Sequence, residues 1–396
     1  MKFGGFYELQ LPRPWTPESE HQQLKDSLDQ VELADRLGFD YIWATEHHFL
    51  EEYAHSSAPE VFLAACTQRT KNVRIGHGII QMPPYINHPA RVAERVSTLD
   101  LISDGRVDFG IGAGASETEL GGFRVPQEEK KQMMLEGARA VVEMMTQTPF
   151  PGIDGKYVKM PARNVIPKPY QKPHPPLWMA CSNRASILQA ARLGIGALTF
   201  SFIGPDEARK WVDDYYTTFE KEAEPLGYAV NPNFAIACPL LCDNNEKRVL
   251  EMGAEIFGFF IYGLGYYAFF GEHEPGKSDI WDEFKNHPKN FAPPEGRTQD
   301  CVGTPQRLRE QLREFEAVGI DQVICLSQAG GVSHDQLCSS IELFSKEVMP
   351  EFKEREIKSL PKQAERRARL TEIAMPRRPK VEAPASPTVI RAAGHH

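Results

Sequence analysis

Short apolar runs of strand length alternate with longer segments of helical period along the first 350 residues. Helical period marks residues 18–37, 58–69, 89–101 and 128–145. Eight apolar runs are typical of buried strands: residues 3–7, 39–45, 73–80, 107–112, 177–181, 197–200, 234–241 and 322–326. Eight strands, each followed by a helix, predict an α/β fold of the (β/α)8 TIM-barrel type.

A doubly wound parallel sheet is the competing architecture, because periodicity alone does not exclude it. That fold places a glycine-rich phosphate-binding turn directly after its first strand, with an acidic residue about 20 positions later. Gly4 and Gly5 lie within the first apolar run instead. The sequence therefore favours the barrel.

Two segments depart from the alternation. Residues 242–300 form an insertion between strands 7 and 8, with an aromatic first half and a polar, proline-rich second half. Residues 351–396 contain 11 Lys and Arg against 6 Asp and Glu. We expect one barrel domain over residues 1–350, including the insertion, and a charged C-terminal extension over 351–396. The extension is expected to be helical over 351–373 and disordered from 376 onward.

Composition narrows the function classes. A formal net charge of −9 is the wrong sign for a protein that binds nucleic acid by neutralising phosphates. The seven cysteines are scattered and form no C-x-x-C pair, which favours a reducing compartment over a disulfide framework or a zinc site. We find no signal peptide and no apolar stretch of membrane-spanning length, so we expect a cytoplasmic protein without a membrane partner.

The first candidate for chemistry follows the second strand. The near-continuous apolar run 39–45 ends abruptly in Glu46, His47 and His48. In a barrel the carboxyl ends of the strands form the active-site face. Neighbouring strand residues point in opposite directions, so one imidazole is expected to face the site while the other supports it. The alternatives are surface or capping histidines without chemistry, or a metal site, which the spacing disfavours.

The second candidate is the strand 107–112, where Gly110 and Gly112 fall on one face. Glycines in register within a strand indicate that something approaches the backbone closely. We expect a flat aromatic cofactor to lie against this bare face. Tight packing against a large neighbouring side chain is the alternative.

A third candidate follows the strand 177–181. Ser182, Asn183 and Ser186 precede or begin a helix, and amides at a helix N-terminus form an anion pocket. Ordinary helix capping explains the same residues, and both interpretations stay open.

These motifs together resemble the bacterial luciferase-like flavin-dependent monooxygenases. The resemblance covers residues 1 to about 350 in order. It rests on Glu46-His47-His48-Phe49 and on residues 87–94, 99–106, 109–114, 302–305 and 328–344. It implies a barrel that binds reduced FMN delivered by a separate flavin reductase, with O2 as co-substrate.

The resemblance also assigns residues. His47 matches the family's catalytic base and His48 its essential neighbour, and we expect His47 to transfer the proton while His48 with Glu46 orients it. Ser182, Asn183 and Ser186 match the flavin phosphate pocket. The reactive cysteine and the phosphate-binding arginine of luciferase correspond to Gly112 and Ala113, so Arg184 is expected to supply the missing charge. The family's cis peptide outside proline would fall near Gly78 and Ile79.

The implied reaction oxygenates an apolar aldehyde, ketone or terpenoid-like substrate through a C4a-(hydro)peroxyflavin. An imidazole with a pKa near neutrality would move the proton. We expect the aromatic insertion to exclude water, with Phe259, Phe260, Tyr262 and Tyr266 lining the substrate pocket, unless it is simply a core helix. Exposed rings would serve a homodimer interface or a reductase-docking site. The rival functions are a 5-deazaflavin-dependent hydride transfer and a non-catalytic flavin-binding protein.

Overall fold

A computed structural model describes residues 1–200, 205–286, 301–380 and 389–390. Its centre is a closed barrel in which every neighbouring pair of strands is parallel, in the order β1-β12-β9-β8-β7-β4-β3-β2. The barrel strands are β1 Lys2–Tyr7, β2 Tyr41–Ala44, β3 Arg74–Gln81, β4 Val107–Gly112, β7 Leu177–Cys181, β8 Gly196–Phe200, β9 Phe234–Pro239 and β12 Gln322–Leu326. The predicted TIM barrel is confirmed.

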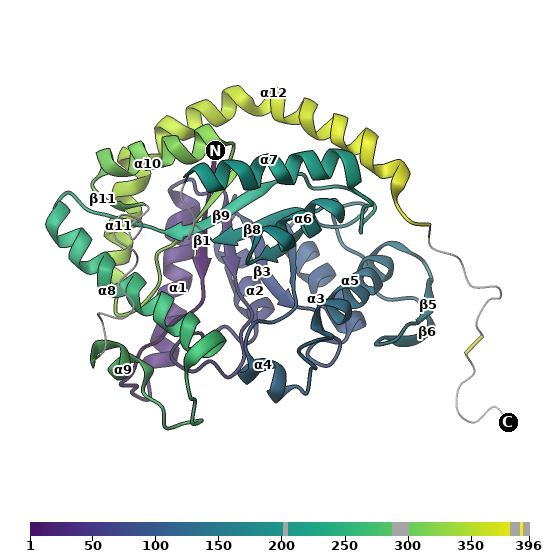
Figure 1. Cartoon of the computed structure of the whole chain (residues 1–396), viewed down its shortest axis with the longest axis horizontal. Coiled ribbons are helices and arrows are strands. Elements are labelled where there is room, and N and C mark those ends of the chain that lie inside the picture. The colour runs from purple at the N-terminus through teal and green to yellow at the C-terminus, as the bar shows by residue number, and fades with distance from the viewer. Residues whose placement is uncertain (201–204, 287–300, 381–388, 391–396) are drawn as a thin grey trace.

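Helices surround the strands, and one major helix follows each of them (Figure 1). These helices are α1 Ser19–Arg36, α2 Pro59–Arg69, α3 Pro89–Ile102, α5 Lys130–Thr146, α6 Arg184–Arg192, α7 Pro205–Glu222, α10 Pro305–Val318 and α11 His334–Glu347. Proline occupies the first turn of α2, α3 and α10, where its missing amide donor is not needed. His88 caps α3, because its side chain accepts from the Ala90 amide.

Two tryptophans fill the middle of the barrel. The rings of Trp43 and Trp178 meet edge to face with centroids 5.4 Å apart, and both side chains are essentially inaccessible. Glycines opposite them make this possible. A Cβ atom on Gly76 would lie 2.2 Å from the Trp43 ring, and one on Gly196 would lie 2.3 Å from the Trp178 ring. The two indoles therefore form a floor beneath the carboxyl ends of the strands.

The insertion between β9 and β12 is mostly helical. It contains β10 Leu241–Cys242, α8 Glu246–Gly265, a π-helical turn η1 Tyr266–Phe270, α9 Ile280–Asn286 and β11 Val302–Gly303. Residues 287–300, part of the predicted polar half, lie outside the described residues. The segment Glu246–Phe270 is long and apolar enough to span a membrane, but more than half of its most apolar window is buried inside the protein. Its buried rings pack with the barrel lumen into one apolar cluster.

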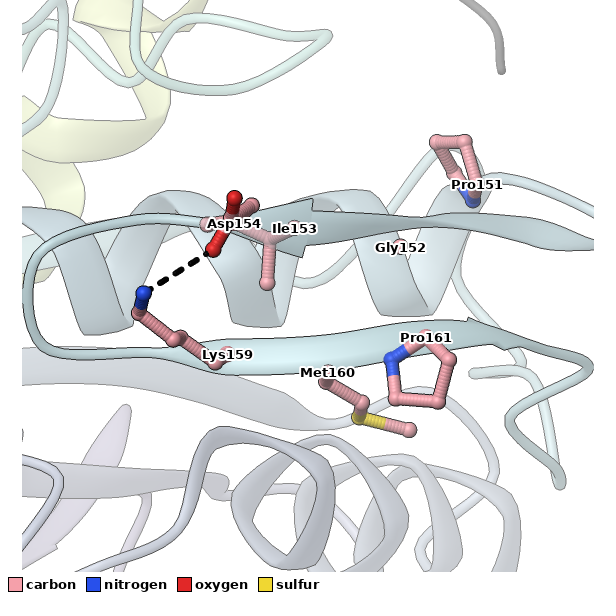
Figure 2. Close-up of a pocket in the computed structure, with 7 residues that line it drawn as sticks. All are labelled: Pro151, Gly152, Ile153, Asp154, Lys159, Met160 and Pro161. Atoms are coloured by element: carbon pink, nitrogen blue, oxygen red, sulfur yellow. Dashed lines mark ion pairs between the residues drawn. The ribbon is translucent and has the colours of Figure 1, made fainter. Parts of the chain in front are cut away.

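A small hairpin outside the barrel occupies the proline- and glycine-rich segment between α5 and β7. Its strands are β5 Phe150–Asp154 and β6 Lys159–Arg163, and sequence periodicity did not predict them. Figure 2 shows the hollow at this hairpin, with Asp154 and Lys159 paired at 3.2 Å near its turn. All residues that line the hollow belong to the hairpin. It therefore contains none of the candidate site residues.

The C-terminal extension is helical where the sequence predicts it. The long helix α12 Met349–Ala374 is followed by a short 3-10 turn η3 Met375–Arg377 and crosses the same side of the molecule as the N-terminus (Figure 1). The ammonium group of Met1 pairs with Glu356 at 2.7 Å, and Arg366 pairs with Asp321. Residues 381–388 and 391–396, which fall in the segment expected to be disordered, lie outside the described residues.

Candidate active site

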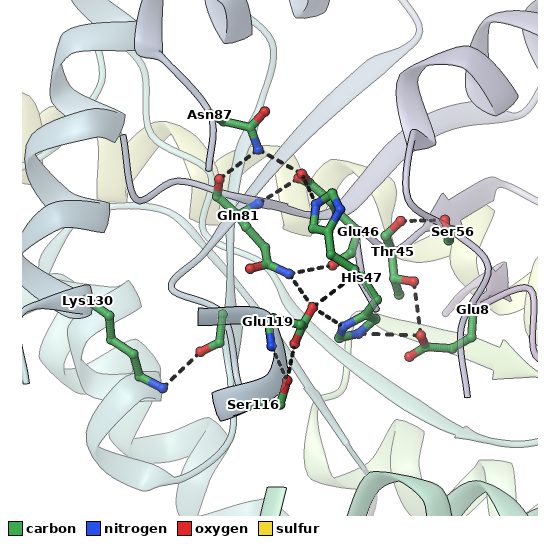
Figure 3. A network of polar contacts seen from close by, with 12 residues as sticks. Glu8, Thr45, Glu46, His47, Ser56, Gln81, Asn87, Ser116, Glu119 and Lys130 are labelled. Carbon is green, nitrogen blue, oxygen red and sulfur yellow. Dashed lines mark hydrogen bonds and ion pairs between the residues drawn. The ribbon is translucent and has the colours of Figure 1, made fainter. Parts of the chain in front are cut away.

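His47 is held between two carboxylates at the carboxyl end of β2. Its Nδ1 atom lies 3.0 Å from Oε1 of Glu119, and its Nε2 atom lies 3.5 Å from Oε2 of Glu8 (Figure 3). Its backbone amide donates to the carbonyl of Ser56. The side chain is 18% exposed, whereas both carboxylates are buried. The imidazole is therefore the accessible member of a buried ionic group.

Glu119 comes from α4 Glu117–Gly122, a helix of six residues after β4. Its Oε1 atom also accepts from the His48 amide at 3.1 Å and from Nε2 of Gln81 at 2.6 Å. Its Oε2 atom accepts from the hydroxyl of Ser116, which caps α4. Full burial with several donors around it keeps this carboxylate charged and fixed.

His48 and Glu46 form a neighbouring pair of their own. Nε2 of His48 lies 2.9 Å from Oε1 of Glu46. Glu46 also accepts from the Gln81 amide at 2.8 Å and from the side-chain amide of Asn87 at 2.7 Å. The expectation that Glu46 and His48 orient the His47 ring is wrong in this structure, because Glu46 is engaged by His48 and the ring nitrogens of His47 face Glu119 and Glu8.

The surrounding charges determine the protonation of His47. Burial alone lowers the pKa of His47, but Glu119 and Glu8 outweigh burial and raise it to about 9. Burial likewise acts to raise the pKa of Glu119, but His47 and the donors around it lower that pKa to about 2. Burial raises the pKa of Glu8. An imidazole that titrates near neutrality was predicted, and the structure instead indicates an imidazolium at neutral pH.

The carboxyl end of the barrel is partly accessible to solvent. Ala180 belongs to β7 and follows Trp178 on the lumen face, and its surface is exposed. It is the penultimate residue of this strand. Gly78 and Ile79 of β3 are half-buried at the same end of the barrel. Solvent therefore reaches the lumen face at the carboxyl ends of these strands.

The two glycines of β4 are covered by atoms of the neighbouring strand β3. Gly110 and Gly112 are buried, and a Cβ atom on Gly112 would lie 2.4 Å from the Ile79 side chain. One on Gly110 would lie 2.2 Å from the His77 carbonyl oxygen. The prediction of a bare face for a cofactor is wrong here, because Ile79 covers it. The peptide bond between Gly78 and Ile79 is cis, as the family resemblance implied.

The expected anion pocket lies at the N-terminus of α6. Ser182, Asn183 and Arg184 are exposed, and Asn183 and Ser186 form a reciprocal capping box. The guanidinium of Arg184 pairs with Asp214 at 2.6 Å. Asn183 and Ser186 therefore cap α6, and the side chain of Arg184 is directed toward α7.

The four residues expected to line the substrate pocket are separated by the structure. The ring of Phe260 lies 5.6 Å from Tyr53, whose ring lies 5.8 Å from that of His47. Phe259 packs instead against Trp281 and Phe284 of α9. Tyr262 and Tyr266 pack against each other and against Phe270. Phe260 is thus separated from His47 by one ring, that of Tyr53, whereas Tyr266 reaches Tyr53 only through Tyr267. All four residues were assigned from composition, which gives no direction to a side chain.

Sequence reasoning missed Glu8, Glu119, Gln81 and Tyr53. Glu8 had a usable signal, because it is the first polar residue after the first strand, as Glu46 is after the second. Glu119 had none, since α4 is too short to show helical period. Within the described residues, no group of three or more His, Cys, Asp and Glu side chains is arranged to hold a metal ion. Free thiols are present at Cys66, Cys181, Cys242, Cys325 and Cys338.

The fold and the site together are those of a (β/α)8 enzyme in which a histidine lies between two buried carboxylates at the carboxyl end of the barrel. A family model described as luciferase-like monooxygenase matches residues 1–322. The oxygenase component of the flavin-dependent trigonelline monooxygenase of Acinetobacter baylyi is 26% identical over 376 residues, which cover 90% of this chain and 97% of that protein. The alkanal monooxygenase alpha chain of Photorhabdus luminescens is 24% identical over 367 residues, with coverages of 90% and 98%.

The fold has solved counterparts as well. The crystal structure of monooxygenase RslO1 from Streptomyces bottropensis superposes with a TM-score of 0.72 at 24% identity, covering 89% of this chain and 100% of that one. Because the family match spans most of its length, the chain belongs to the luciferase-like monooxygenase family. The predicted family is confirmed, and as a member of it the protein is a flavin-dependent monooxygenase.

Proposed function

We propose that this protein is the oxygenase of a two-component system, which uses reduced FMN from a separate flavin reductase and O2 to oxygenate an apolar organic substrate. An aldehyde, a ketone or a terpenoid-like molecule fits this description. The family supports the proposal, as does the relative from Acinetobacter baylyi, whose name describes it as an oxygenase component.

The observation that carries the proposal is a charged imidazole at the solvent-accessible carboxyl end of the barrel. Ala180 is exposed near the end of β7, and the partly exposed His47 follows β2 on the same face of the barrel. Bound reduced FMN would supply the electrons that activate O2, which no amino-acid side chain in the site provides. Such chemistry requires both room for the cofactor at this face and a polar group beside it.

Residues at the carboxyl end of the barrel offer contacts that would hold the cofactor. Half-buried Gly78 and Ile79 present backbone and an aliphatic side chain for a flat ring. The exposed first turn of α6, with Ser182, Asn183 and Ser186, offers donors for a phosphate. We assign the phosphate to this turn and not to Arg184, because Asp214 already neutralises Arg184.

His47 would hold and move the proton of the reaction. Its Nε2 atom makes the longer of its two carboxylate contacts, 3.5 Å against 3.0 Å at Nδ1. Nε2 is therefore the atom from which a proton can be donated to a ligand in the mouth. The ring of Tyr53 adjoins His47, and Phe260 packs on Tyr53, so that both rings limit the access of water.

Further features complete the proposal. We infer a cytoplasmic homodimer in which residues 1–350 form the catalytic domain and residues 351–396 an extension of it. The rival functions are a hydride transfer from a reduced 5-deazaflavin, which needs no O2, and flavin binding without turnover.

An anaerobic titration that measures the affinity for reduced FMN tests whether the cofactor binds in the barrel mouth. Replacing Ala180 with Trp would fill the mouth, so the variant should lose affinity by at least about tenfold. Ala317→Trp is the matched control, because Ala317 is exposed on α10 and should leave the affinity unchanged. If Ala180→Trp and the wild type bind reduced FMN with equal affinity, the barrel mouth is excluded as the flavin site.

A further inference from the structure

The short helix α4 contacts both active-site histidines. Glu119 bonds to the ring of His47 and to the backbone amide of His48. Phe123, at the C-terminal end of α4, packs edge to face on the His48 ring with centroids 4.9 Å apart. This one short helix is thereby linked to both histidines.

The glycine-rich segment after β4 places this helix. Residues 112–116 connect the barrel strand to α4, and Gly114 adopts a φ of +80°, which favours glycine. A Cβ atom on Gly114 would lie 2.8 Å from the side-chain oxygen of Gln81, which is part of the same network. This glycine-rich segment thus leads the chain into α4 and brings Glu119 to the two histidines.

Several charged groups face His47 from different elements. Glu8 approaches from the end of β1, Glu119 from α4, and Glu46 from the loop that carries His47. The phenol of Tyr53 comes from the same loop, and its ring adjoins the imidazole. Lys130 of α5 donates to the carbonyl of Gly114, and its charge interacts with that of Glu119. Among these groups, Glu119 alone contacts His47 at normal hydrogen-bond distance.

We infer that Glu119 is the positioning residue of this active site, which fixes the His47 ring and keeps it protonated for transfer to the ligand. The assignment rests on the proposed function, because it concerns the proton donor of that reaction. Glu119 touches neither the mouth nor solvent, since it is fully buried. It therefore acts through His47 and not on the substrate.

The test is an NMR titration of His47 in the full-length protein without flavin, with the signal assigned by its loss in His47→Asn. In the wild type His47 should titrate near pH 9. Glu119→Gln removes the charge and should lower the pKa of His47 by at least about one pH unit, which is tenfold in its proton dissociation constant. Glu117→Gln on the exposed side of α4 is the matched control and should leave the titration unchanged.

A second variant separates charge from general damage to α4. Ser116→Ala removes the cap and one bond to Glu119 but keeps the carboxylate, so His47 should still titrate near the wild-type value. An equal fall in both variants, or an unchanged titration in Glu119→Gln, would overturn the inference. The wild-type spectrum is a readout that needs no variant, because a pKa of His47 at or below its ordinary value of about 6.5 would also overturn it.

Turnover distinguishes the failure of this inference from the failure of the proposed function. In the oxygenation assay, the limb where activity declines at high pH should move to lower pH in Glu119→Gln. If no variant and no wild-type sample oxygenates a substrate while the NMR shift is present, the proposed reaction fails and the link between Glu119 and His47 stands. If oxygenation occurs and its pH profile is identical in Glu119→Gln, the positioning role fails.

Discussion

The Nδ1 atom of His47 lies 3.0 Å from Oε1 of Glu119, although 72 positions separate the two residues in the chain. His47 follows β2, and Glu119 lies on a helix after β4. The closed barrel brings the ends of both strands to one face, where the carboxylate and the imidazole meet out of water. This pair explains why His47 is charged at neutral pH, and the predictions on activity follow from it.

Replacing His47 with Asn should leave the binding of reduced FMN intact while oxygenation slows. Loss of a positioned proton donor costs about 10²- to 10⁴-fold in rate. The measurement is the rate of oxygenated product formation beside an anaerobic FMN titration. His21→Asn, at an exposed position on α1, is the control. A product rate unchanged in His47→Asn would remove His47 from the reaction.

The charge of His47 also predicts a pH dependence of stability. Its pKa is raised by Glu119 and Glu8, against burial, to about 9, above the unfolded value of about 6.5. The stabilisation is therefore fully present below pH 6.5 and is lost as the pH rises through 9. The free energy of unfolding should fall over this range by on the order of 1–3 kcal/mol. Urea denaturation of the wild type and His47→Asn checks this, because the difference between them should shrink toward pH 9.

His77 on β3 should be a source of instability. Its side chain is inaccessible, and neither ring nitrogen has a hydrogen-bond partner among the described residues. Burial lowers its pKa to about 3, so the unfolded chain gains a proton below pH 6.5 that the folded protein does not. His77→Leu should raise the free energy of unfolding by about 1–3 kcal/mol, and by more at pH 5 than at pH 7.5. A less stable variant at both pH values would contradict this account.

Glu52 should fix helix α9 of the insertion to the loop that follows β2 and carries His47. This buried carboxylate accepts from the amides of Ile280 and Trp281 at the start of α9, at 2.6 and 3.2 Å, and from the Arg13 amide at 2.9 Å. Glu52→Ala leaves these amides without a partner and should destabilise the protein by about 2–4 kcal/mol. It should also speed proteolysis within residues 271–286. Glu255→Ala, on the exposed side of α8, should do neither.

The alternation of apolar runs was sufficient to predict the barrel. All eight predicted strands overlap observed ones, because strands buried on both faces are apolar along their whole length. The hairpin β5-β6 was missed, since Phe150–Asp154 and Lys159–Arg163 are short, mostly half-buried and rich in proline and glycine. Periodicity carries no signal in such segments.

The site was predicted only in part, and the reason is geometric. His47 and His48 follow a strand directly, so the sequence locates them. The partners of His47 come from the ends of β1 and β4, and a single sequence does not state which loops meet. The glycines of β4 were correctly read as a close approach, but the approaching group is Ile79 of the neighbouring strand. The sequence likewise does not state in which direction each ring on α8 points, and the structure shows that Phe259 faces α9.

In the proposed reaction, one atom of O2 enters an organic product and the other leaves as water. The most direct measurement supplies reduced FMN from a flavin reductase under oxygen gas labelled with the heavy isotope, together with a medium-chain aldehyde, a cyclic ketone and a terpenoid in turn. We predict that one labelled oxygen atom appears in the product of at least one substrate, and that His47→Asn greatly reduces this incorporation. Release of all consumed O2 as hydrogen peroxide with every substrate, or turnover with a reduced 5-deazaflavin in the absence of O2, would contradict it.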